Sequence, residues 1–250
     1  MTSVRVERYA HTARVILDRS AKRNAISGDV AAELAAAFLS LSDEADLRVV
    51  VLSGDGPSFC AGADVKELAA LTPETAESFI RGLHAAISAA MLCPVPIIAA
   101  IRGACIGAGL ELVAGCDMRI ASHDARFSMP EVKIGVPSVI EAALLPRLMG
   151  RGRAARLVLS GEAIDAETAF KWGLIEELVP GDDLMFRAGA LAAEIAEADP
   201  MAVRAQKRLI RAWDDMTIEQ AVEASVREFA DSYRTDAPRA RIAAALAGKA

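Results

Sequence analysis

The pattern of hydrophobic and polar positions predicts strands that alternate with helices over much of the chain. Residues 4–17 are rich in valine and isoleucine and partly alternate, which predicts two short strands with a turn near 10–12. The runs RVVVLSG and PIIAAIRG are continuously apolar, as expected for strands that are buried on both faces. Ser27 is a candidate N-cap for a helix whose apolar residues recur at helical spacing: Val30, Leu34, Phe38 and Leu41.

Caps and breaks predict the remaining elements. Thr72 and Pro73 begin a long helix, and Ser138 is expected to cap a helix that runs through Leu148. Later boundaries are marked at Ser160-Gly161, at Asp165, at Trp172-Gly173, and at helix breaks near Pro200, 214–217 and 235–238. The segment LIEELVP reads as a strand. Strands and helices followed by helices alone indicate an α/β core with a helical C-terminal region.

We therefore predict a core domain over residues 1–198 and a helical region over residues 199–250. The helical region carries more large apolar residues than a solvated appendage needs. They are Leu209, Ile210, Trp213, Val222, Val226 and Phe229. We expect this region to mediate oligomerisation or to serve as a lid.

Composition narrows the class of protein. Hydrophobic residues make up 53% and charged residues 25%, which is typical of a globular protein. The 28 basic and 34 acidic residues form no block of one sign, so we expect no nucleic-acid partner. The N-terminus has no apolar signal segment. The uncharged run 85–101 contains two prolines, so we interpret this run as a helix end joined to a buried strand and not as a membrane span.

The cysteines indicate a reducing compartment. Cys60, Cys93, Cys105 and Cys116 have no C-x-x-C spacing and each lies in apolar sequence, so buried reduced thiols in a cytoplasmic protein are expected. With only three histidines and no paired cysteines, a zinc site is not predicted.

Two acids in apolar settings are the candidate chemistry. Glu111 follows the glycine-rich segment 103–109, where the backbone can turn sharply and approach a ligand, and Glu131 lies 20 residues further on. The pair can serve acid/base catalysis, or each acid can belong to a structural ion pair, and spacing alone leaves both open. The segment lacks the G-x-G-x-x-G and GK[ST] patterns of phosphate loops.

Other catalytic interpretations are weaker. His84 has no acid or nucleophile beside it in the sequence, which favours a packed core or interface histidine over a catalytic one. No G-x-S-x-G elbow is present, so a serine hydrolase is not supported.

Several motifs in order give the chain a specific resemblance. They are LDR…RNAI, RVVVLSGDGPSFCAGADVKEL, IRGACIGAGLELVAGCDMRIAS, FSMPEVKIGV, LLPRLMG and KWGLIEEL. Together they resemble the enoyl-CoA hydratase/isomerase (crotonase) superfamily. The resemblance implies a spiral of repeated ββα units with C-terminal helices for trimerisation, and a coenzyme A thioester as substrate.

The resemblance also implies roles for individual residues. The amides of Ala63 and Ala108 would form an oxyanion hole, Glu111 would deprotonate water, and Glu131 would protonate Cα. Neighbouring carboxylates push one pKa up, so one can rest protonated while the other is ionised. Contacts to the coenzyme A portion are expected from Lys22, Arg23, Ala25, Ala61, Ala63, Asp64, Val65, Lys66, Gly107 and Ala108. A solvated loop is an equal interpretation of Lys22 and Arg23. No metal or separate cofactor is implied, because coenzyme A is part of the substrate.

The predicted function is hydration of a 2-enoyl-CoA by a homotrimer or a dimer of trimers. Alternatives are a Δ3,Δ2-enoyl-CoA isomerase, which needs only Glu131, and an inactive binding or assembly subunit. The turn after Glu131 reads PSVIEAA where many hydratases have a PGAGG-type turn, and Ser138 stands nearest the aspartate of dienoyl isomerases. Glu141 is interpreted as a solvated helix residue over an acyl-pocket acid. The tail RIAAALAGK lacks the aromatic residue that relatives use near adenine, which leaves Lys249 as a partial substitute.

Overall fold

A six-stranded sheet forms the centre of the computed structural model, which describes residues 2–248. Its strand order is β1-β2-β3-β4-β6-β9, and every neighbouring pair is parallel except β1 and β2. The strands are β1 (Val4–Tyr9), β2 (Thr12–Leu17), β3 (Val49–Gly54), β4 (Ile97–Ile101), β6 (Met118–Ser122) and β9 (Glu177–Val179). All five residues of β4 are buried, as the continuous apolar run predicted.

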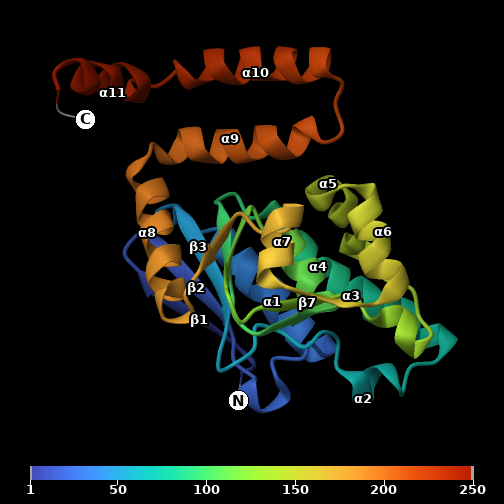
Figure 1. Ribbon diagram of the computed structural model, residues 1–250. Coiled ribbons are helices and arrows are strands. Elements are labelled where there is room, and N and C mark those ends of the chain that lie inside the picture. The colour runs from blue at the N-terminus through green and yellow to red at the C-terminus, as the bar shows by residue number, and fades with distance from the viewer. Residues whose placement is uncertain (1, 249–250) are drawn as a thin grey trace. The chain divides into compact units, whose positions relative to one another are not determined.

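A second sheet is interleaved with the first along the chain. It has the order β5-β7-β8, with β5 (Ala104–Ile106) parallel to β7 (Arg126–Ser128) and β8 (Ala163–Asp165) antiparallel to β7. Cys60 extends this sheet through a bridge to Cys105. The chain therefore visits the large sheet, the small sheet and a helix in turn, and this repetition forms a spiral of ββα units (Figure 1).

Helices cover the sheets and follow the predicted caps closely. Helix α1 begins after Ser27, whose side chain accepts a hydrogen bond from Val30 N, and it packs against α3. The helices of the spiral are α1 (Gly28–Ser42), α2 (Val65–Leu68), α3 (Pro73–Leu92), α4 (Ala108–Ala114), α5 (Leu145–Met149), α6 (Arg151–Ser160), α7 (Ala166–Trp172) and α8 (Leu184–Glu197). Single 3₁₀ turns are η1 (Ser20–Lys22), η2 (Glu131–Ile134), η3 (Ile140–Leu144) and η4 (Gly181–Asp183).

The predicted helix from Ser138 to Leu148 is wrong in its first half. The chain forms the 3₁₀ helix η3 over 140–144, and α-helical geometry begins only at Leu145, one residue before Pro146. Ser138 does not cap a helix, because its hydroxyl donates to Glu131 Oε2. Pro146 sits at the first turn of α5, where its missing N–H costs nothing.

The chain divides into two compact units, residues 1–193 and 194–250, with the boundary inside α8. The predicted boundary after residue 198, with its assignment of the second part to oligomerisation, stays a prediction. The second unit contains α9 (Pro200–Trp213), α10 (Ile218–Ser232) and α11 (Ala237–Leu246). Helices α9 and α10 pack together, and Arg208 pairs with Glu228 at 2.6 Å. Lys249 lies outside the described residues.

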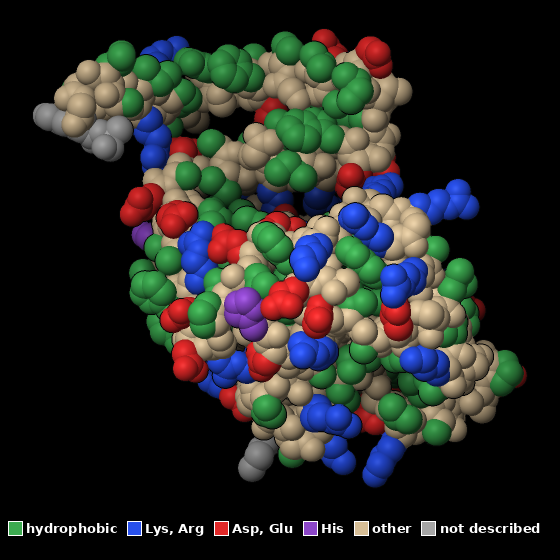
Figure 2. Space-filling view, in the orientation of Figure 1, with side chains coloured by type: hydrophobic (Ala, Val, Ile, Leu, Met, Phe, Trp, Pro, Cys, Tyr) green, Lys and Arg blue, Asp and Glu red, His purple; other side chains and the backbone are tan. Residues whose placement is uncertain are grey.

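The four cysteines are buried free thiols, as the sequence predicted. On the face shown in Figure 2, basic and acidic side chains are interspersed. Over residues 2–248, none of the helices has the length and apolar character needed to cross a bilayer.

Candidate active site

Two small-residue turns lie side by side because consecutive units of the spiral repeat the same geometry. Cys60 and Cys105 pair across the small sheet, and the chain then turns through Gly62 in one unit and Gly107 in the next. Both glycines have positive φ, 97° and 52°, which side chains rarely adopt. A Cβ on Gly107 would also collide with Glu131 Oε1. Glycine at Gly107 therefore permits this backbone conformation and leaves room for the Glu131 carboxyl group.

Ala63 and Ala108 each lie three residues after the paired cysteines, so the two turns present equivalent amides. Among the described residues, neither amide N–H donates a hydrogen bond to the rest of the chain. Unpaired N–H groups are uncommon in buried backbone, and Ala108 is only 4% exposed. These amides are available to an acceptor on a ligand.

A cleft of about 560 Å³ opens above these amides. Its walls are mostly apolar, and the contributing residues include Leu68, Leu71, Phe79, Ile80, Leu83, Ile134, Val136 and Val139. The two amide-bearing residues line it together with both candidate acids, Glu111 and Glu131. An apolar cleft with few convergent polar groups is typical of a small-molecule site.

Glu111 lies in the first turn of α4 and is 4% exposed. Its Oε1 accepts a hydrogen bond from Ala142 N at 3.3 Å. Burial, and then the charge of Glu131, raise the pKa of Glu111 to about 8. Such a shift in a cleft is typical of functional acids.

Glu131 is positioned by the next unit of the spiral. It follows β7 and begins η2, and its Oε2 accepts a hydrogen bond of 2.8 Å from Ser138 Oγ. Pro130 precedes it and lines the same cleft. The structure thus brings together acids that are 20 residues apart in sequence.

Glu141 corrects a prediction made from the sequence. It is 6% exposed, so it is not a solvated helix residue, and His84 Nδ1 lies 2.6 Å from its Oε1. The His84 side chain is 54% exposed, so within this chain it is not a packed core histidine, and it does contact an acid. That acid is 57 residues away in sequence, which is why inspection of neighbouring positions missed it.

The residues predicted to contact coenzyme A fall into two groups. Ala61, Ala63, Val65, Gly107 and Ala108 line the cleft. Lys22, Arg23, Ala25, Asp64 and Lys66 are not among the residues that line it.

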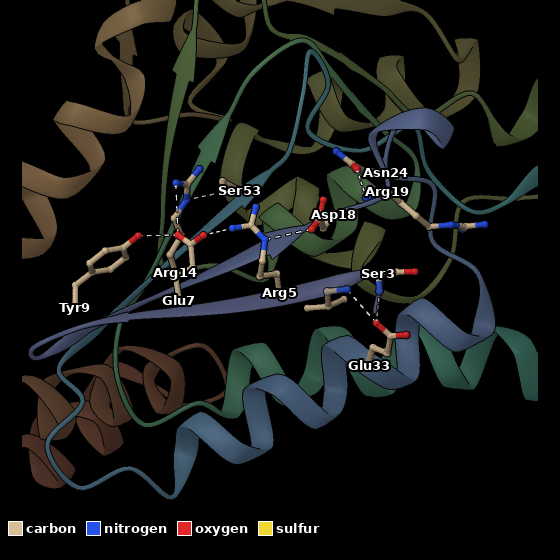
Figure 3. Close-up of polar contacts among 11 residues, drawn as sticks. Ser3, Arg5, Glu7, Tyr9, Arg14, Asp18, Arg19, Asn24, Glu33 and Ser53 are labelled. Carbon is tan, nitrogen blue, oxygen red and sulfur yellow. Dashed lines mark hydrogen bonds and ion pairs between the residues drawn. The ribbon is translucent and has the colours of Figure 1, made fainter. Parts of the chain in front are cut away.

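The residues that do not line the cleft nevertheless lie next to those that do. Ala61 N donates to Arg23 O, and Ile26 N donates to Gly62 O, so the loop after η1 runs beside the cleft turn. Asn24 fixes this loop: its side chain accepts from Arg19 N (Figure 3) and donates to Ser58 O. Asp64 caps α2 and pairs with Arg19 at 3.3 Å, which gives it a structural task.

The chain is similar to known proteins in sequence and in structure. Residues 7–244 match the enoyl-CoA hydratase/isomerase family. A probable enoyl-CoA hydratase from Mycobacterium bovis is 32% identical over 235 residues, covering 94% of this chain and 91% of that protein. An (E)-benzylidenesuccinyl-CoA hydratase from Thauera aromatica is 35% identical, covering 88% of this chain and 86% of that protein.

The solved structure of an enoyl-CoA hydratase from Bacillus anthracis is similar along almost the whole chain. Its TM-score is 0.95 at 30% identity, with 99% of this chain and 97% of that chain covered. The chain belongs to the enoyl-CoA hydratase/isomerase family, and the predicted fold class is confirmed.

Proposed function

We propose that the protein is an enzyme that adds water across the double bond of a 2-enoyl-CoA thioester. The observation that carries this proposal is the convergence, in one apolar cleft, of two unpaired amides and two carboxyl groups. Family membership and hydratase relatives support the same reaction.

In the proposed reaction the thioester oxygen accepts hydrogen bonds from Ala63 N and Ala108 N. Water attacks Cβ while Glu111 takes its proton, and the electrons of the double bond move onto the thioester as an enolate. Glu131 then gives a proton to Cα, which restores the carbonyl. One oxyanion donor is typically worth about 3–4 kcal/mol, so the two amides supply a large share of the acceleration.

The protonation state of Glu111 sets the pH dependence. Because its pKa is raised to about 8, mainly by burial, most molecules hold a proton on this carboxyl at neutral pH. A general base must be ionised, so kcat/KM for hydration should rise with pH through about 8. Only well above that value do nearly all molecules carry the base in its active form.

The walls of the cleft support an apolar acyl group as substrate. Phe79, Ile80 and Leu83 of α3 line it together with Val136 and Val139. We propose that the loop with Lys22, Arg23 and Ala25, together with Asp64 and Lys66, lies along the coenzyme A portion. The hydrogen bonds between this loop and residues 61–64 support that path.

Self-association and compartment are also proposed. One face of α10 exposes Ile218, Val222, Val226 and Phe229, and these exposed apolar side chains support a trimer or a dimer of trimers. The buried free thiols support the cytoplasm as the compartment.

The experiment that tests the proposed function is a panel of enoyl-CoA thioesters of graded length and branching. Loss of absorbance from the conjugated thioester reports hydration directly. We expect turnover of apolar 2-enoyl thioesters and none of the corresponding saturated thioesters. No hydration of any member would overturn the assignment.

A further inference from the structure

The 3₁₀ helix η3 buries a third carboxyl group that the reaction just described does not use. Glu141 is 6% exposed, and its Oε1 is bonded to His84 Nδ1 at 2.6 Å. Its Oε2 is buried and has no hydrogen-bond partner among the described residues. A buried carboxyl with an unsatisfied oxygen is costly, so its retention here requires an explanation.

The same short helix holds Glu111 in place. Ala142, the residue after Glu141, donates its amide to Glu111 Oε1 at 3.3 Å. Ile140, the residue before it, has φ of 42°, a strained conformation for a β-branched side chain. Backbone strain concentrates at sites where geometry matters more than stability. The strain, the buried acid and the bond to Glu111 thus occupy consecutive residues.

The elements that pack against η3 are α3, α4 and α5. Their charged or titratable side chains are Glu74, Glu77, Arg81 and His84 on α3, Glu111 on α4 and Arg147 on α5. Glu131, in η2, raises the pKa of Glu111. Glu141 is not among the residues that line the cleft, whereas Glu111, which η3 contacts through Ala142 N, is one of them.

We propose that Glu141 and His84 form a positioning pair. In this pair the Nδ1–H of His84 keeps the buried carboxylate of Glu141 ionised, and the negative charge of Glu141 makes Glu111 a stronger proton acceptor. The inference rests on the proposed function, since it assigns Glu111 the role of base. Donation by Nδ1 leaves Nε2 as the second ring nitrogen of an imidazole whose side chain is 54% exposed.

The electrostatics agree in direction. After burial and the charge of Glu131, the charge of Glu141 also raises the pKa of Glu111. Burial raises the pKa of Glu141 itself, while the hydrogen bond from His84 opposes that rise. Without His84, the carboxyl of Glu141 would lose the side-chain donor that opposes the effect of burial on its pKa, so it should hold a proton more readily.

Removal of the charge of Glu141 should change the pH dependence of hydration, which loss of a purely structural role would not do. Glu141→Gln keeps the volume, so Glu111 should ionise at lower pH and also be a weaker base once ionised. The rising limb of kcat/KM should move to lower pH and its plateau should fall. We expect the ratio of variant to wild-type kcat/KM to be at least about threefold higher at about pH 6.5 than at about pH 9.5, since a shift of half a pKa unit is about threefold.

The His84 variants give a second, independent route. His84→Leu removes the donor at an exposed position and should reproduce the pH signature of Glu141→Gln, whereas His84→Gln keeps a donor and should restore part of the wild-type profile. The double variant His84→Leu/Glu141→Gln should shift the limb no further than Glu141→Gln alone. Glu33→Gln is the matched control, because Glu33 accepts bonds from Ser3 N and Val4 N away from the cleft (Figure 3).

Infrared difference titration of the Glu111 carboxyl separates this inference from the proposed function. The band is assigned by its absence in Glu111→Gln, and we expect its midpoint to fall in Glu141→Gln and in His84→Leu, but not in Glu33→Gln. A midpoint that stays unchanged in both variants would overturn the positioning pair, even if hydration is observed. A shifted midpoint without any hydration would keep the electrostatic coupling and overturn the assignment of Glu111 as base.

Discussion

Glu111 is a carboxyl group whose pKa burial raises, whereas the proposed reaction needs it ionised. A glutamate in an unfolded chain has a pKa of about 4.3, whereas burial raises that of Glu111 to about 8. Between these values the folded chain holds a proton that the unfolded chain releases. Folding therefore takes up a proton, and the free energy of unfolding should fall as pH rises from about 4.5 to about 8.

Glu111→Gln should remove that penalty and stabilise the protein at alkaline pH. At about 1.4 kcal/mol per pKa unit, the gain is on the order of a few kcal/mol above pH 8 and vanishes below pH 4.5. Chemical denaturation of both proteins at several pH values measures it. Stability curves that remain parallel across this range would mean that Glu111 is not a protonated buried acid.

At this scale the sequence predicted both acids of the cleft but misjudged Glu141. Glu111 and Glu131 stand in apolar runs, and each indeed lines the cleft. Glu141 has the same apolar neighbours, yet its burial depends on the left-handed conformation of Ile140 and on contact with α3. Neither a positive φ at isoleucine nor a partner 57 residues away leaves a local signal.

At the scale of elements, caps and apolar periodicity predicted most helices and strands. The exceptions are β6 and the small-sheet strands β5, β7 and β8, which no pattern predicted, and the first half of the helix expected from Ser138, which the 3₁₀ helix η3 replaces. Ser138 bonds to Glu131 instead of capping, which no spacing rule indicates. Local sequence patterns fail in this segment because contacts around the cleft, and not the helix propensity of the segment, determine its backbone conformation.

The glycine turn between β5 and α4 gives a prediction at this scale. Gly107→Ala places a methyl group against Glu131 Oε1 in a backbone conformation with φ of 52°. We expect hydration to fall by at least about a hundredfold, as for loss of a general acid. Gly150→Ala is the control, because Gly150 has φ of 83° but no atom within 4 Å of an added Cβ. The Gly150→Ala variant should lose stability and keep its turnover per folded molecule. Equal losses of activity in both variants would show that backbone strain alone, and not the position of Glu131, explains the effect.

At the scale of the whole molecule, the spiral makes the cleft from equivalent points of successive ββα units. The sequence indicated alternating strands and helices, while the winding that pairs Cys60 with Cys105 was expected only through the resemblance to a family. Spacing along the chain does not predict which strands belong to the second sheet. Assembly stays a prediction at this scale.

Light scattering of the full chain at micromolar concentration should give the mass of a trimer or a hexamer. Phe229, which is 68% exposed on α10, belongs to the apolar face that we expect an assembly to cover. Phe229→Asp should lower the mass by placing a charge in that interface, while Glu223→Gln on the same helix serves as the control. A wild-type chain that remains monomeric would contradict the proposed self-association.

In the proposed reaction, two carboxyl groups in one cleft, those of Glu111 and Glu131, divide the proton transfers of hydration. The most direct measurement is kcat for a crotonyl-type thioester in wild type, Glu111→Gln, Glu131→Gln and the double variant. We predict losses of at least about a hundredfold in each single variant and less than the product of the two in the double variant, because both groups act in one event. If wild type does not hydrate and Glu111→Gln still isomerises a 3-enoyl thioester at the wild-type rate, Glu111 is a structural acid and the account is wrong.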